Sequence, residues 1–149
     1  MDLNFKKSVI IDNFNNPNNK GLVDDNSYYK VNVDSKTCID NLDFMVKIDC
    51  DIIKDIKFDG EACVISTSLS SIISDFLVGK KVDDALSIIE NYENMIDERN
   101  YDKEKIEILE VYDDISKQPN RKKCALLPIE GVKKVLLEYK SKGDKKNEK

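Results

Sequence analysis

The sequence predicts an α+β domain in which a three-stranded antiparallel sheet packs against several helices. Three observations support this prediction: three short runs in the first half of the chain carry apolar residues at alternate positions, apolar residues recur at helical spacing on both sides of these runs, and the apolar content suits a single core. With 149 residues, of which 40% are hydrophobic, the chain fits one domain. We expect this domain to span residues 1–139.

The first expected element is a short amphipathic helix over residues 4–14, followed by a turn. The apolar positions of this helix are Phe5, Val9, Ile10 and Phe14. Their helical spacing favours a helix with one apolar side, and we expect that side to pack on the sheet. The phrase NNPNNKG at 15–21 combines asparagine, proline and glycine, the residues that turns prefer.

Three strands are expected next, over residues 27–33, 42–48 and 52–58, because apolar and polar residues alternate in each. The second and third strands would form a hairpin whose tip carries Cys50 between Asp49 and Asp51. A cysteine at an exposed tip lies far from the other cysteines of the chain, so we expect that Cys50 is not a metal ligand.

Cys63 follows the third strand and precedes a helix. Asp59-Gly60 is interpreted as the turn that ends the strand, and Gly79 as the left-handed residue that closes the helix. The free amide groups at a helix start favour a thiolate over a thiol, which lowers the pKa of a cysteine there. Thiolates bind metals and carry sulfur, whereas the alternative for Cys63 is a buried cysteine with a structural role.

The second half of the chain predicts two further helices separated by a charged interval. An amphipathic helix is expected from Val82 to a point near Asp97 to Asn100. Residues 101–120 are rich in charge, and we expect Ile106, Leu109 and Val111 to be their only apolar anchors.

Pro119-Asn120 is a good entrance to the last helix, whose first turn would carry Arg121 and Cys124. Pro128 then interrupts the pattern. Either the helix kinks there, or a short turn carrying Cys124 precedes a helix that begins at Pro128, so the direction of Cys124 is left open. Residues 140–149 predict a charged, disordered end.

Composition excludes several classes of function. A net charge of −5 and a pI near 4.9 argue against nucleic acid or an anionic membrane as the main partner. The chain shows no signal-peptide pattern and no run of 18 apolar residues, so we expect a soluble cytoplasmic protein without a membrane partner. Four cysteines without an export signal indicate reduced thiols, and the absence of histidine removes imidazole as ligand, base or nucleophile activator.

Cys38, Asp40, Cys63 and Cys124 form a candidate metal site because each stands at the boundary of an expected element. The cysteines are 25 and 61 residues apart, unlike the closely paired ligands of zinc ribbons and fingers. Three thiolates and a carboxylate suit Zn²⁺, which accepts both ligand types, but three sulfurs could instead hold an iron–sulfur cluster. For Asp40 the alternative is an exposed loop carboxylate that never touches a metal.

The sequence motifs around these residues identify a family more specifically than the spacing does. NNPNNKG at 15–21, TCID at 37–40, FDGEACVIS at 58–66 and RKKC at 121–124 occur in the order typical of U-type iron–sulfur assembly proteins. The chain therefore resembles the NifU/IscU-like family from about residue 11 to residue 137, and its SufU branch more than its IscU branch. The absence of histidine, the absence of an LPPVK-type phrase before Cys124 and an insertion at about 80–118 favour the SufU branch. This insertion is either a surface excursion without a role or a docking segment for a partner.

The resemblance implies a zinc-dependent sulfur acceptor, acting as a sulfurtransferase, that pairs with a cysteine desulfurase of the SufS type. It implies that Cys38, Asp40, Cys63 and Cys124 are the zinc ligands, that Cys38 accepts the sulfur, and that Arg121 assists ligand exchange. A histidine of the desulfurase would then take the zinc and free Cys38.

Two alternatives to this interpretation remain open. The chain could be a scaffold on which a transient iron–sulfur cluster is assembled and passed to downstream proteins, or an interaction domain that zinc merely stabilises. Arg121 could also be one of several solvated basic residues at a helix start.

Overall fold

The structure, a computed structural model, describes residues 1–36 and 39–147, with side chains described as far as residue 142. It confirms the predicted α+β fold with a three-stranded antiparallel sheet. In chain order the elements are α1 (Leu3–Asn15), β1 (Tyr29–Asp34), β2 (Asn41–Asp49), β3 (Ile52–Glu61), α2 (Val64–Phe76), α3 (Val82–Ile96), α4 (Lys103–Ile106), the 3₁₀-helix η1 (Glu107–Lys117) and α5 (Pro119–Asn147). None of the helices described is long and apolar enough to cross a membrane.

The sheet has the strand order β1-β2-β3, and β2 and β3 form a tight hairpin. Cys50 and Asp51 make its two-residue turn with φ angles of 52° and 65°, as a type I′ turn requires. Cys50 is exposed at this tip, as predicted. At the usual rise per residue β2 is about 27 Å long. This length separates the tip that carries Cys50 from the end of the strand that follows Asp40.

β3 runs further than the sequence analysis expected, because Asp59-Gly60 continues the strand and does not form a turn. Gly60 pairs with Leu42 and has a φ of 133°, and a Cβ atom there would lie 2.1 Å from the carbonyl oxygen of Asn41. Only glycine allows the two strands to approach this closely. The pairing ends at Asn41 with Glu61, so the residues just outside it, Asp40 and Cys63, are brought near one another.

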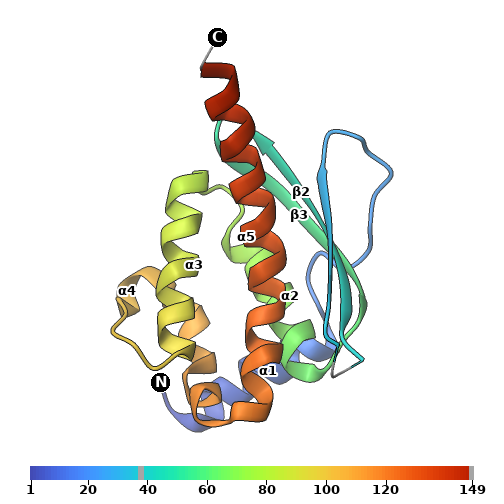
Figure 1. The fold of residues 1–149 in the computed structure, drawn as a ribbon. Coiled ribbons are helices and arrows are strands. Elements are labelled where there is room, and N and C mark those ends of the chain that lie inside the picture. The colour runs from blue at the N-terminus through green and yellow to red at the C-terminus, as the bar shows by residue number, and fades with distance from the viewer. Residues whose placement is uncertain (37–38, 148–149) are drawn as a thin grey trace.

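Two helices cover one face of the sheet. α5 lies over β1 and β2, α2 lies over β3, and α3 packs on α5 away from the sheet (Figure 1). The core includes two fully buried tyrosines, Tyr92 of α3 and Tyr112 of η1. Their rings pack edge to face with the ring centroids 6.3 Å apart. α2 ends at Phe76, three residues earlier than expected, although Gly79 does have a positive φ of 90°.

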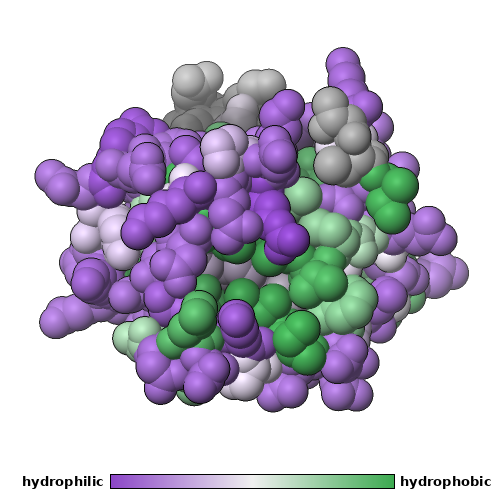
Figure 2. Space-filling view, turned by 90° about the horizontal axis from the view of Figure 1, so that it is seen from below, coloured by the Kyte–Doolittle hydropathy of each residue, from purple (hydrophilic) through white to green (hydrophobic). Residues whose placement is uncertain are grey.

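α1 packs on α2 and η1, and the expectation that it packs on the sheet is wrong. On its inward side Val9 and Ile10 pack against the core, and polar contacts flank them. Lys6 bridges to Asp113 at 2.7 Å and Asp114 at 3.2 Å, and Asn13 accepts a hydrogen bond from Ser71 at 2.7 Å. No residue of α1 is buried. The face of the molecule seen from below shows apolar residues gathered among hydrophilic ones (Figure 2). α1 itself carries four exposed large apolar side chains, those of Leu3, Phe5, Ile11 and Phe14.

The insertion is part of the core, so the interpretation as a mere surface excursion is wrong. Its buried side chains recur at every third position, as a 3₁₀-helix with three residues per turn requires. The residues on this period are Ile106, Leu109, Tyr112 and Ile115, and Val111 and Ser116 beside them are buried as well. Tyr112 and Ile115 thus join the three anchors that the sequence analysis expected to be the only ones. The charged residues between them hid this three-residue period, which differs from the helical spacing sought in the sequence.

α5 is one continuous helix from Pro119 to Asn147 with Pro128 inside it, so no separate helix begins at Pro128. Pro128 and Gly131 are buried where α5 crosses the sheet. The helix also includes residues 140–147, for which a disordered end was expected. Lys140 there pairs with Asp83 at 2.7 Å, which ties the helix to α3.

Candidate metal centre

Three of the four predicted ligands converge where three elements begin. Asp40 precedes β2, Cys63 is the N-cap residue of α2, and Cys124 lies near the start of α5. One carboxylate oxygen and the two sulfurs all lie within 4.8 Å of one another. Asp40 is 1% exposed, Cys124 is 8% exposed and Cys63 is half-buried. Most of the surface of these three residues is therefore shielded from solvent by the rest of the protein.

Cys63 occupies the position that the sequence predicted for it, at the head of a helix. Its backbone is extended, with φ −68° and ψ 173°, and its sulfur accepts the backbone N–H of Ser66 at 3.4 Å. The sulfur thus takes the place that a serine or aspartate oxygen has in other N-caps. An amide donor and the positive end of the helix dipole both lie at this sulfur.

Asp40 is held on both of its oxygens. Oδ1 accepts the backbone N–H of Cys63 at 2.7 Å, and Oδ2 accepts the hydroxyl of Ser66 at 3.0 Å. Its carbonyl accepts the backbone N–H of Ser35 at 2.9 Å, which closes the loop between β1 and β2. The alternative of an exposed loop carboxylate is therefore wrong, because the side chain is buried and fixed against the first turn of α2.

Ser66 is a site residue that the sequence analysis missed. Its fully buried hydroxyl lies 3.0 Å from Oδ2 of Asp40 and 2.8 Å from the carbonyl oxygen of Cys124, and Cys63 Sγ approaches it at 3.7 Å. One side chain thus touches all three of the converging residues. The signal in the sequence was a serine three residues after a helix-capping cysteine, a position that faces back toward the cap.

Cys124 lies in surroundings that oppose its ionisation. Burial, and then the hydrogen bond and negative charge of Cys63 and the charge of Asp40, raise the pKa of Cys124 to about 12. Groups that become negative are therefore crowded together, an arrangement that a bound cation stabilises. Two sulfurs and a carboxylate oxygen are donors that zinc accepts together, so the residues present fit a zinc ion.

The structure does not bring every predicted site residue into the cluster. Cys38 lies outside the described residues. Arg121 is exposed in the first turn of α5, and its guanidinium makes no hydrogen bond or ion pair with any residue that the structure describes. Cys50 lies at the far tip of the hairpin, where its sulfur donates to Oδ1 of Asp49 at 3.6 Å.

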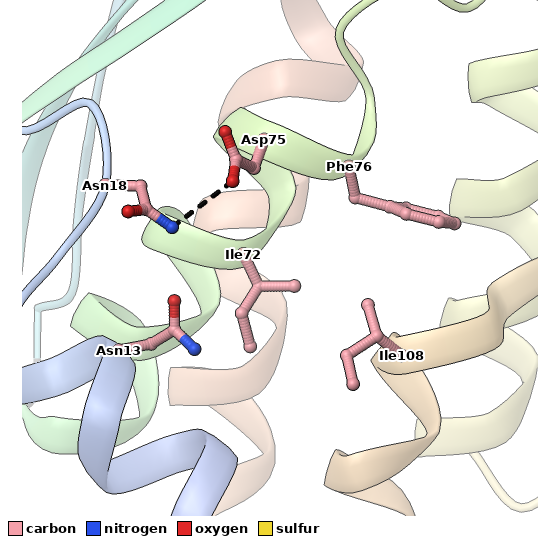
Figure 3. Close-up of a pocket in the computed structure, with 6 residues that line it drawn as sticks. All are labelled: Asn13, Asn18, Ile72, Asp75, Phe76 and Ile108. Carbon is pink, nitrogen blue, oxygen red and sulfur yellow. Dashed lines mark hydrogen bonds between the residues drawn. The ribbon is translucent and has the colours of Figure 1, made fainter.

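A separate hollow of about 360 Å³ lies near the C-terminal end of α2, away from Cys63 (Figure 3). It is lined by Asn13, Asn18, Ile72, Asp75, Phe76 and Ile108. Its polar side chains hydrogen-bond within the protein: Asn18 donates to Asp75 at 3.3 Å, and Asn13 donates to the carbonyl of Val9 at 2.9 Å. Because these groups are already partnered, the hollow is less suited to chemistry than the cluster at the other end of α2.

Comparison with known proteins finds matches over most of the chain. The model of the NifU-like N-terminal domain matches residues 5–100. The zinc-dependent sulfurtransferase SufU of Bacillus subtilis (strain 168) is 35% identical over 130 residues, which cover 86% of this chain and 86% of that protein. The iron–sulfur cluster assembly scaffold protein IscU of Thermotoga maritima is 30% identical over 128 residues, covering 86% of this chain and 89% of that protein.

Solved structures share the fold. A crystal structure of a putative iron–sulfur cluster assembly scaffold protein for the SUF system from Fervidobacterium islandicum superposes with a TM-score of 0.77 at 25% identity, covering 86% of this chain and 93% of that one. A NifU-like N-terminal protein from Brucella abortus superposes with a TM-score of 0.79, covering 93% and 99%. The latter is 16% identical and shows the likeness of fold alone.

Proposed function

The chain belongs to the NifU-like N-terminal domain family as a SufU-type member, and from this premise we propose that it is a zinc-dependent sulfur acceptor serving a cysteine desulfurase in iron–sulfur cluster biogenesis. Its membership confirms the resemblance inferred from the four motifs. The observation that carries the proposal is the convergence of Asp40, Cys63 and Cys124 at one buried point. This donor set includes no histidine, as the composition requires.

We assign the fourth ligand to Cys38. The covalent chain allows at most about 7 Å between alpha carbons two residues apart, so Cys38 is within reach of the cluster through Asp40. Three sulfurs and one oxygen would complete a four-coordinate set around zinc. When bound, the ion would keep the thiols deprotonated at neutral pH.

Cys38 is also the residue we assign as sulfur acceptor. Its neighbour Ile39 is 76% exposed, whereas Cys124 is 8% exposed and Cys63 caps a helix. A sulfur delivered by another protein must meet a side chain at the surface, which favours the cysteine between Lys36 and Ile39. In the transfer, the Cys38 thiolate attacks the outer sulfur of the desulfurase persulfide, a new S–S bond forms on Cys38, and the desulfurase cysteine leaves as a thiolate.

Arg121 is the residue we assign to help Cys38 leave and rejoin the ligand set. It stands one turn before Cys124 on the same helix, and its exposed guanidinium is free of ion pairs with the described residues. A permanently charged, unpaired side chain at this position can draw a thiolate or carboxylate away from the cluster.

The second candidate is a scaffold that carries a transient iron–sulfur cluster. The similarity to the Thermotoga IscU protein favours it, and thiolate ligands suit a cluster as well as zinc. The relay is the better supported of the two because the similarity to the zinc-dependent SufU is greater, and because Cys38 would complete the donor set without a histidine.

Incubation with L-cysteine, a SufS-type desulfurase and a reductant tests the proposal. If the protein is a relay, it should multiply sulfide release by the desulfurase. It should also contain about one zinc per chain when purified. Unchanged sulfide release together with a brown chromophore on addition of iron would support the scaffold. If neither appears, the protein is an interaction domain that zinc stabilises.

A further inference from the structure

Ser66 lies at the one point where the three described members of the candidate metal centre meet. Its backbone N–H donates to Cys63 Sγ at 3.4 Å, and its hydroxyl contacts Oδ2 of Asp40 at 3.0 Å and the carbonyl oxygen of Cys124 at 2.8 Å. The three residues come from the loop before β2, from α2 and from α5. The hydrogen bond from Cys63 to Asp40 already links the first two of these elements, and Ser66 joins the third, α5, to them.

The contact with the Cys124 carbonyl depends on Pro128. In an α-helix the carbonyl of residue 124 would accept the N–H of residue 128, but proline has no N–H to donate. A buried carbonyl that loses its helical donor costs free energy unless another donor replaces it. The Ser66 hydroxyl replaces it at 2.8 Å from a different helix, so the proline that breaks the helical pattern also creates the attachment point for α2.

A serine hydroxyl has one proton and can donate to only one acceptor at a time. Here it stands between two acceptors, Oδ2 of Asp40 and the carbonyl of Cys124. Oδ1 of Asp40 is already bonded to the N–H of Cys63, so Oδ2 is the oxygen with acceptor capacity to spare. Because the Cys124 carbonyl competes for the proton, Oδ2 keeps lone pairs that a cation can use.

We propose that Ser66 is the positioning residue of the metal centre: it fixes Asp40 and Cys124 relative to one another. It does so through its hydrogen bond to the Cys124 carbonyl, the group that Pro128 leaves without a helical donor. The inference rests on the proposed metal site. It assigns no ligand role to Ser66, whose effect is on where the ligands stand before a metal arrives.

Ser66→Ala tests the proposal by zinc competition against a chromogenic chelator. Loss of a residue that orients metal ligands typically lowers metal affinity about 10–100-fold, and we expect a loss in this range. Ser70→Ala is the matched control, because Ser70 is equally buried on the same helix and its 2.7 Å hydrogen bond goes back to the carbonyl of Ser66 within that helix. Unchanged affinity in Ser66→Ala, or an equal loss in Ser70→Ala, would overturn the proposal.

Pro128→Ala supplies the missing donor and shows whether the effect runs through the Cys124 carbonyl. In that background the helix satisfies the carbonyl itself, so Ser66→Ala should cost at least about threefold less zinc affinity than in the native chain, a coupling of about 0.65 kcal/mol. An equal cost in both backgrounds would exclude the link to Pro128 and overturn the proposal.

Amide exchange in the metal-free protein separates positioning from general loss of stability, and from failure of the proposed function. The N–H of Cys63 is donated to Asp40, so Ser66→Ala should speed hydrogen exchange at Cys63 while the second half of α2 keeps its protection. Faster exchange along the whole of α2 would mean that Ser66 is merely structural. If the native protein binds no zinc, the proposed function fails, and the exchange at Cys63 still decides whether Ser66 positions Asp40.

Discussion

The two ends of the β2–β3 hairpin carry the same kinds of residue in opposite settings. At the tip, Cys50 stands between Asp49 and Asp51, exposed to solvent, and Asp51 is bonded to Tyr139 at 2.6 Å. At the other end, Asp40 and Cys63 are joined by a 2.7 Å hydrogen bond and are closed in by α5. The comparison shows that cysteine and aspartate make a candidate metal site only where packing fixes their donor atoms toward a common point.

Cys38→Ser carries the largest expected effect of the substitutions considered. A hydroxyl cannot carry persulfide sulfur, so this variant should keep its fold but reduce stimulation of the desulfurase to background. Sulfide release with L-cysteine and a reductant measures the effect, with circular dichroism as the check on folding. Full stimulation would mean that Cys38 is not the acceptor.

Substitutions of Asp40 should change the zinc affinity, unlike a substitution at the tip of the hairpin. Loss of a residue that orients the ligands without binding the metal typically costs about 10–100-fold in metal affinity. Asp40→Ala, which removes a ligand, should lose more zinc affinity than this and should also lose stimulation of the desulfurase. Asp40→Cys should bind zinc at least as strongly, because thiolate is a softer ligand, yet stimulate poorly because the site releases a ligand less readily. Zinc competition beside sulfide release measures both variants, and unchanged affinity in both would show that Asp40 does not touch the metal.

Gly60→Ala tests whether the strand pairing itself creates the buried end. A Cβ at this position would meet the carbonyl oxygen of Asn41 at 2.1 Å, at a φ of 133° that alanine avoids. The clash and the backbone strain together should lower the free energy of unfolding by at least about 2 kcal/mol. Urea denaturation measures this loss, and Gly21→Ala is a suitable control because it also has a positive φ, 119°, but no atom within 4 Å. Equal losses in the two variants would contradict a special role for the close approach at Gly60.

Cys50→Ala should have the smallest effect. Its side chain is exposed and points to no cluster of ligands among the described residues. Zinc content and sulfide release should both match those of the native chain. Loss of a stoichiometric zinc would place Cys50 in the site and would contradict the strand register.

Much of the fold could be predicted because its signals are local. Alternation marked all three strands, and a cysteine between a strand and a helical run marked the helix cap. Gly60 was misread because Asp-Gly most often forms a turn, whereas its pairing with Leu42 and its close approach to Asn41 show that a strand passes through it. The packing of α1 was also misjudged, since its partners are α2 and η1, whose contacting residues, such as Ser71 and Asp113, lie far away in the sequence.

The candidate site could be predicted by its ligands but not by what holds them. Cys63 and Cys124 were indicated by motifs, whereas Ser66 acts through a contact with residue 124 that spans 58 positions. Pro128 was noticed as an irregularity, but its consequence depends on which hydroxyl faces the carbonyl it leaves open. Such pairings depend on the three-dimensional packing of α2 and α5, which no periodicity in the sequence reports.

X-ray absorption at the zinc edge of the purified protein tests the central claim most directly. The proposed site predicts three sulfur ligands at about 2.3 Å and one oxygen at about 2.0 Å. The spectrum should be the same for Cys50→Ala and should lose one sulfur in Cys124→Ser. A shell of four sulfurs, or a shell with no sulfur, would contradict a centre built from Cys38, Asp40, Cys63 and Cys124.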